Sequence, residues 1–121
     1  MKVSTAFVTL ASDNLQTLVE FYQRLLLQEP QSYVPGRYAE FVLPGLTLAL
    51  FKPSQDSVAE FTGTASSMSV CLEVGDLVDA IATLETIGYP PPGEIIYASH
   101  GQEIYAYDPA GNRLILHQSP K

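Results

Sequence analysis

The chain has one cysteine, few basic residues and no long hydrophobic run, and each shortage excludes a class of protein. Cys71 has no second cysteine with which to form an internal disulfide. A chain without disulfides suits a reducing compartment. The first residues are also too polar, and their apolar run too short, for a secretory signal peptide. We therefore expect a cytoplasmic protein.

Basic residues and long apolar segments are equally scarce. Six Lys and Arg face thirteen Asp and Glu, which gives a formal net charge of −7. Nucleic acids and anionic membrane surfaces both require a basic footprint. No apolar run approaches the roughly 18 residues of a membrane-spanning helix. We expect neither nucleic acid nor a membrane as a partner.

Several common catalytic motifs are missing as well. The sequence contains no GxSxG elbow, no P-loop and no Rossmann glycine pattern. Its 121 residues, 46% hydrophobic and 16% charged, are typical of one compact globular domain.

What the sequence does contain is one pattern that occurs twice. Each copy is predicted to have a strand, an amphipathic helix, a short extended piece and a hairpin. In the first copy these elements fall at residues 5–11, 14–28, 32–34, 37–43 and 46–51. In the second copy they fall at residues 68–74, 76–88, 94–98 and 104–118, where the last range is the whole hairpin.

The repeat predicts the domain organisation. Residues 1–121 form a single α+β domain made of two βαβββ modules, 5–52 and 68–118, joined by an aperiodic linker at 53–67. One module with a single helix cannot cover both faces of its sheet. Two modules can share a curved mixed eight-stranded sheet, with the helices outside and the inner faces around a cavity.

The inner face can be predicted from the alternation of side chains along strands. In the last hairpin, the turn Asp-Pro-Ala-Gly-Asn separates two runs, and Asp is expected to bond its own backbone there. One face then carries Glu103, Tyr105, Tyr107, Arg113, Ile115 and His117. The first hairpin should likewise put Tyr38, Glu40 and Val42 with Thr47, Ala49 and Phe51. These mixed aromatic and polar faces favour a cavity that binds something polar.

Two carboxylates on this face have two interpretations. Glu40 and Glu103 are costly in an apolar cavity unless they are paired. Arg37 and Arg113 are candidate internal partners. The alternative is a cationic ligand, which aromatic faces would also attract.

The other reactive side chains have structural alternatives too. His117, near a strand end, is either a half-exposed residue that bonds a neighbour or a base or ligand. His100 is a residue at the rim of the pocket or a solvent-exposed loop residue. Cys71, in an apolar strand, is expected to be buried and inert.

Three segments carry a resemblance to a known family. They are S-D-N-L-Q-T-L-V-E-F-Y at residues 12–22, E-V-G-D-L-V-D-A-I-A-T-L at 73–84 and G-Q-E-I-Y-A-Y-D-P-A-G-N-R-L at 101–114. In this order they resemble the vicinal-oxygen-chelate superfamily of glyoxalases, extradiol dioxygenases and fosfomycin- and bleomycin-resistance proteins. The resemblance implies paired βαβββ modules and a homodimer with pockets in or between the sheet cups.

The superfamily's enzymes hold a divalent metal, and the resemblance places its ligands at Phe7, Ala49, Ser69 and Ile115 of this chain. Phenyl, methyl and butyl groups offer no lone pair, and a lone serine hydroxyl is a poor ligand. We therefore expect no metal, no other cofactor and no metal-dependent lyase or dioxygenase activity.

The resulting prediction is a small-molecule binding protein, like the metal-free bleomycin-resistance branch that sequesters an antibiotic. The alternative is an enzyme of the same superfamily that uses an unorthodox metal site, or Glu40 or Glu103 as its base with Tyr105 as a hydrogen-bond donor. The predicted partners are a homodimer mate and an aromatic or cationic ligand. No catalytic residue is assigned, and the predicted ligand-binding residues are Phe7, Tyr38, Glu40, Ala49, Phe51, Ser69, His100, Glu103, Tyr105, Ile115 and His117.

Overall fold

A computed structural model describes residues 1–62 and 67–120. The chain divides into two compact units, Met1–Gly63 and Thr64–Lys121. Each unit contains one βαβββ module with a four-stranded mixed sheet. The predicted α+β fold of two βαβββ modules is therefore confirmed.

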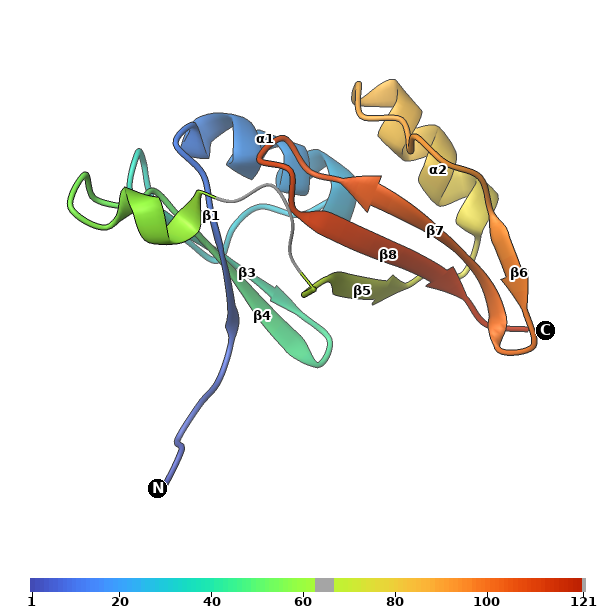
Figure 1. The fold of residues 1–121 in the computed structure, drawn as a ribbon, viewed down its shortest axis with the longest axis horizontal. Helices are drawn as coiled ribbons and strands as arrows, with labels where there is room; N and C mark the ends of the chain where they lie inside the picture. Colours follow the sequence, from blue (N-terminus) through green and yellow to red (C-terminus); the bar gives the residue numbers. More distant parts are fainter. Residues whose placement is uncertain (63–66, 121) are drawn as a thin grey trace. The chain divides into compact units, whose positions relative to one another are not determined.

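The first unit contains one helix, four strands and a short 3-10 helix (Figure 1). Its sheet has the order β1-β4-β3-β2, with β1 parallel to β4 and the other pairs antiparallel. The elements are β1 (Val8–Ala11), α1 (Leu15–Leu26), β2 (Ser32–Val34), β3 (Tyr38–Leu43), β4 (Leu46–Phe51) and the 3-10 helix η1 (Val58–Phe61).

Local chemistry explains where α1 begins and what it buries. The side chain of Asn14 accepts a hydrogen bond from the Thr17 N–H at 3.2 Å, which caps the N-terminus. The helix ends at Leu27, whose φ of 55° is left-handed. Its apolar side faces the sheet, and its buried residues are Leu15, Leu18, Val19, Phe21 and Tyr22.

The second unit repeats the arrangement with the strand order β5-β8-β7-β6, and Figure 1 shows α2 alongside this sheet. The α2 N-terminus is capped twice: Asp76 accepts from the Asp79 N–H at 3.1 Å, and the Gln118 side chain accepts from the Leu77 N–H at 2.7 Å. The elements are β5 (Val70–Glu73), α2 (Leu77–Thr86), β6 (Ile96–Ala98), β7 (Gly101–Tyr107) and β8 (Arg113–Gln118).

The turn between β7 and β8 is held by the buried carboxylate of Asp108. Its Oδ1 accepts from the backbone N–H groups of Ala110 and Asn112, each at 2.9 Å, and its Oδ2 accepts from the Asn112 side chain at 2.8 Å. The expectation that Asp bonds its own turn is confirmed.

One face of each sheet forms the core of its unit, and we call the other the open face. Buried side chains alternate along the strands on the helix side, among them Ala39, Phe41, Leu48, Leu50, Ile104, Ala106, Leu114 and Leu116. The strand register puts the predicted cavity residues of both hairpins on the open faces. The face assignments made from sequence alternation are therefore confirmed.

Three details differ from the sequence prediction. The eight strands pair as two sheets of four, not within a single sheet. Strands β1 and β5 begin later than expected, so Phe7 and Ser69 precede them. The predicted linker includes η1, and its Phe61 ring packs edge-on against Phe51, with centroids 4.9 Å apart. Positions 63–66 of that linker lie outside the described residues.

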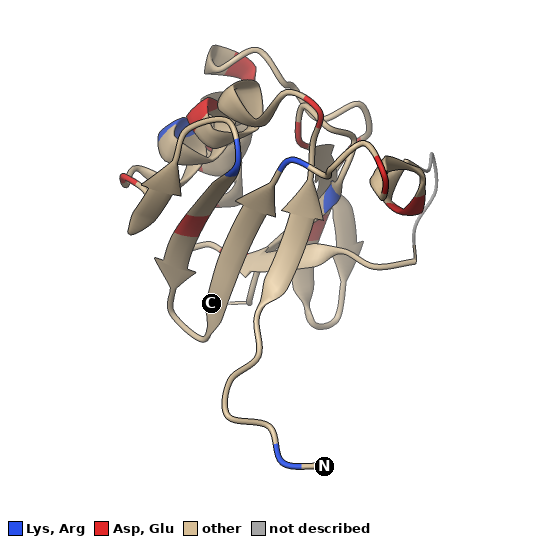
Figure 2. Cartoon of the chain, turned by 90° about the vertical axis from the view of Figure 1, so that its left-hand side faces the viewer, with Lys and Arg blue, Asp and Glu red and all other residues tan. Residues whose placement is uncertain are grey.

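No helix in the described part of the chain is long and apolar enough to cross a membrane. The Lys and Arg positions in Figure 2 lie in separate segments, and the acidic residues outnumber them.

Candidate functional site

The open face of the second unit consists of three rows of side chains across its strands. The first row is polar, the second is mostly apolar, and the third joins a tyrosine to an arginine. By register the rows are Ile96–Glu103–His117–Glu73, Tyr105–Ile115–Cys71 and Tyr107–Arg113.

The polar row contains a hydrogen-bonded chain that ends at a loop histidine. His117 Nδ1 lies 2.6 Å from Glu73 Oε1, and His117 Nε2 lies 3.1 Å from His100 Nδ1. The two imidazoles stack with centroids 5.2 Å apart and an interplanar angle of 21°. The other carboxylate oxygen of Glu73 accepts from the backbone N–H of Ser119 at 2.8 Å and from its hydroxyl at 2.9 Å.

These contacts change the ionisation of both partners. The hydrogen bond from His117, followed by those from Ser119, lowers the pKa of Glu73. The hydrogen bond to Glu73 raises the pKa of His117, and the charges of Glu73 and Glu103 raise it further. The His117 side chain is only 15% exposed, whereas that of Glu73 is 57% exposed. The row is therefore built to hold an imidazolium beside a carboxylate.

Cys71 lies on the open face beside Ile115 and is exposed, so the prediction of a buried thiol is wrong. It lies on the side of β5 that the helix does not cover. Desolvation raises the pKa of Cys71, and the charges of Glu103 and Glu73 raise it further. A raised pKa leaves little thiolate at neutral pH, in agreement with the predicted low reactivity.

The open face of the first unit is less polar. The Tyr38 hydroxyl donates to Glu40 Oε2 at 2.6 Å, so Glu40 has a partner that the sequence prediction did not include. This hydrogen bond, then desolvation, raises the pKa of Tyr38. Ala49 is fully buried, whereas Phe7 is 50% exposed.

The positions at which the sequence resemblance implies metal ligands do not offer a usual ligand set here. Phe7 and Ser69 precede the strands. In the observed register, the strand residue that pairs with Ala49 is Thr9, and the one that pairs with Ile115 is Cys71. Among these side chains only the Cys71 thiol is a usual ligand, and one thiolate does not make a site. In the described ranges, no group of three or more His, Cys, Asp or Glu residues could hold a metal ion.

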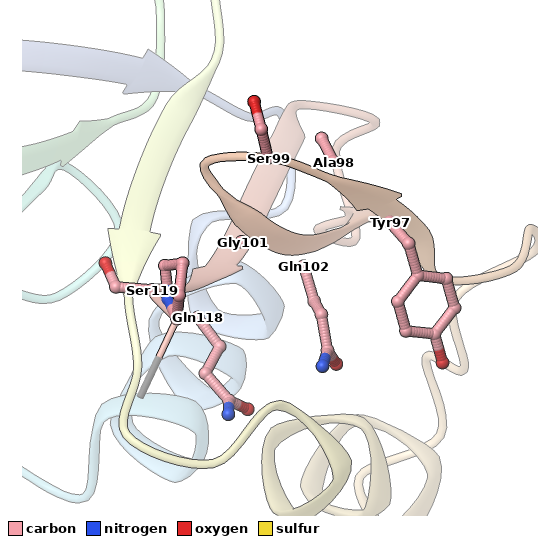
Figure 3. A pocket seen from close by; sticks show the side chains of 8 residues that line it. Tyr97, Ala98, Ser99, Gly101, Gln102, Gln118 and Ser119 are labelled. Carbon is pink, nitrogen blue, oxygen red and sulfur yellow. The ribbon is translucent and has the colours of Figure 1, made fainter.

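A separate hollow of about 520 Å³ lies at the end of the β6–β7 hairpin. Figure 3 shows Gln102 and Gln118, which project from neighbouring strands on the helix side of the sheet, and Tyr97 at the edge. Gln118 is already used to cap α2. The hollow has no charged lining residue, which makes it a weaker candidate than the open face.

The structure brings some predicted site residues together. It places His100, Glu103 and His117 in one group, with Tyr105 and Ile115 beside it, and joins Tyr38 to Glu40 in the other unit. That these residues bind a ligand stays a prediction. Sequence reasoning missed Glu73 as a site residue, although its spacing of two from Cys71 assigns both to one strand face.

Neither a protein-family model nor a curated relative matches this sequence. Solved structures do match over almost the whole chain. A glyoxalase/bleomycin resistance protein from Catenulispora acidiphila is 20% identical with a TM-score of 0.71, covering 95% of this chain and 97% of its own. The fosfomycin resistance protein FosX from Listeria monocytogenes is 18% identical with a TM-score of 0.74, covering 99% and 96%.

A third structure is described as an enzyme. Lactoylglutathione lyase from Agrobacterium tumefaciens is 19% identical with a TM-score of 0.70, covering 98% of this chain and 96% of its own. Together these neighbours show that the chain has the glyoxalase/bleomycin-resistance fold. The resemblance in the sequence motifs is thus confirmed at the level of the fold.

Proposed function

We propose that the protein binds a small aromatic molecule on the open face of its second unit, without the usual metal. One observation carries the proposal: Tyr105 and Tyr107 are 41% and 39% exposed on a sheet face, beside the half-buried Ile115. Exposed aromatic rings around an apolar strip are typical of ligand sites. The neighbours named as bleomycin and fosfomycin resistance proteins share the fold that carries this face.

The order of the rows suggests the ligand's chemistry. A flat ring would lie over the Tyr105–Ile115–Cys71 row. A positively charged group on that ring would face Glu103, and an anionic group would face Arg113 at the other end. An aromatic cation such as a basic antibiotic suits the acidic end and the net charge of −7.

The second candidate is an enzyme, since one neighbour of this fold is named a lyase. Glu40 is a poor choice for its base, because one oxygen already accepts a hydrogen bond from Tyr38 at 2.6 Å. Glu103 lies opposite His117. Its carboxylate, like that of Glu73, favours the protonated form of His117. The polar row therefore supports chemistry at the histidines better than at Glu40 or Glu103.

A thermal-shift screen with aromatic metabolites and antibiotics tests the binding proposal. A ligand at 100 times its Kd raises the free energy of unfolding by about 2.7 kcal/mol. We expect hits whose shift is lost in Tyr105→Ala and, for cationic compounds, reduced in Glu103→Gln. The matched control is Tyr97→Ala, because Tyr97 projects from the same sheet toward the opposite face and is 73% exposed.

Hits that respond to Tyr97→Ala and not to Tyr105→Ala would move the site to the helix-side hollow. A screen without any hit that depends on Tyr105 would refute the open-face proposal. Two further proposals accompany this function: location in the cytoplasm, which the lone Cys71 favours, and assembly as a homodimer.

A further inference from the structure

We propose that His100, backed by His117 and Glu73, is a metal-free general base for an aromatic carbon acid bound on the open face. The inference rests on the proposed binding function, because the ligand must lie over the Tyr105–Ile115 row to reach the histidines. It adds a reaction to that function and assigns it to three residues that are hydrogen-bonded in series.

The direction of the hydrogen bonds follows from the groups involved. A carboxylate only accepts, so His117 Nδ1 must donate to Glu73 Oε1. The Nε2 of a neutral His117 is then an acceptor, and His100 Nδ1 must donate to it. A neutral His100 is left with a lone pair on its own Nε2. No described residue hydrogen-bonds that atom, and His100 is exposed.

The groups around His117 favour its protonation. Glu73 faces His117 from β5, Glu103 faces it from β7, and His100 stacks on it from the β6–β7 loop. Two carboxylates therefore stabilise a positive charge on His117. Ser119 holds the second oxygen of Glu73, which fixes the carboxylate in place. The raised pKa of His117 agrees with this arrangement. The base form is the pair of neutral imidazoles, which is present at pH values above that raised pKa.

Gly101 allows the two imidazoles to meet. It has a φ of +131°, and a Cβ at this position would lie 2.2 Å from the Gln118 carbonyl oxygen and 3.1 Å from His117 Nε2. The backbone next to His100 can approach β8 this closely only because residue 101 has no side chain. The loop histidine is thereby held against the strand histidine.

The proposed step is a proton transfer. The C–H bond of the substrate breaks, its proton goes to His100 Nε2, and its electron pair stays on the substrate. The His100 Nδ1 proton passes to His117 Nε2, so that the positive charge rests on His117 beside Glu73. The proton later returns to the product or to water, which restores both neutral imidazoles.

The probe is 5-nitrobenzisoxazole, a flat aromatic carbon acid. Removal of its ring C–H proton forms a nitrile, breaks the N–O bond and releases a coloured phenolate, so turnover is followed by absorbance. Binding is measured separately by quenching of tyrosine fluorescence. We expect the purified full chain, treated with chelator, to convert the probe faster than an equal concentration of free imidazole.

The variants separate the base from the residues that position it. His100→Ala should lower the rate at least about 100-fold, the lower end of the usual effect of a general base, with unchanged probe binding. Glu73→Gln keeps an acceptor for His117 but removes the charge, so the inflection of the pH–rate profile should move to lower pH. In nitrogen-detected NMR, the same variant should lower the pKa of His117. Glu94→Gln, an exposed loop change, is the control.

The outcomes distinguish the two proposals. A probe that binds with dependence on Tyr105 but turns over equally in wild type and His100→Ala overturns the base and leaves the binding function intact. NMR that finds the proton of neutral His117 on Nε2 also overturns the base. Binding that does not respond to Tyr105→Ala overturns the binding proposal and this inference with it. Circular dichroism of each variant checks that it is folded.

Discussion

At the scale of single residues, the contact between Glu73 and His117 links stability to pH. The pKa of Glu73 is lowered in the folded state, so its contribution is present above its ordinary pKa and is lost as pH falls through the lowered value. The pKa of His117 is raised, so its contribution is present below its ordinary value of about 6.5 and is lost as pH rises through the raised value. Both contributions to stability are fully present between the ordinary pKa of Glu73 and the ordinary pKa of His117.

Glu73→Gln should therefore lower the melting temperature more at about pH 5.5 than at about pH 9, where less of the wild-type His117 is charged. Thermal unfolding followed by circular dichroism at both pH values measures the difference. Glu94→Gln should show little change at either pH, because Glu94 is an exposed loop residue. An equal or larger loss at pH 9 would contradict the interpretation.

Among the described glycines, Gly101 is the one at which an added side chain would clash most severely. We expect Gly101→Ala to cost at least about 2 kcal/mol of unfolding free energy, since it combines backbone strain with a clash against the β8 backbone. Denaturant unfolding gives the value. The matched control is Gly93→Ala, where a Cβ meets nothing within 4 Å, and that change should be close to neutral. If Gly101→Ala unfolded at the same denaturant concentration as wild type, the turn would have accommodated the added Cβ without cost.

At the scale of elements, the helix end at Leu27 is the clearest local conflict. This residue has a φ of 55° and is 87% exposed. It therefore adopts a strained left-handed conformation without burying its side chain. Leu27→Gly should stabilise the protein by about 0.5–1 kcal/mol, because the relief of strain exceeds the extra freedom of Gly in the unfolded chain.

Thermal unfolding measures the effect of Leu27→Gly, with Leu26→Gly as the comparison. Leu26 is the last residue of α1, where a glycine should destabilise instead. A loss of stability in Leu27→Gly would mean that the Leu27 side chain has a packing role that its exposure conceals.

The elements were predictable because their signals are local. Asn14 and Asp76 cap the two helices, and Asp108 closes its turn, through hydrogen bonds to residues two to four positions away. The short 3-10 helix η1 was missed, because a single turn gives no periodicity. It is held partly by the contact of Phe61 with Phe51, ten positions earlier in the chain.

At the scale of the whole molecule, we expect a homodimer. Each sheet ends in two strands that have one neighbour within their unit, β1 and β2 in one and β5 and β6 in the other. Uncovered strand edges are usually paired or protected, and a symmetric contact between identical chains does this economically. Light scattering at micromolar concentration should give about 26 kDa, twice the 13.2 kDa of one chain. A stable species of 13 kDa would contradict the expectation.

The sequence by itself determined the repeat, the element order and the open faces. These properties depend on residue types and on spacings of a few positions. The tertiary structure alone decided that Glu73 meets His117, that His100 stacks on it, and that Cys71 is exposed. The first contact joins residues 44 positions apart through the parallel register of β5 and β8. No local pattern encodes that register, because it is set by how two strands pack together under one helix.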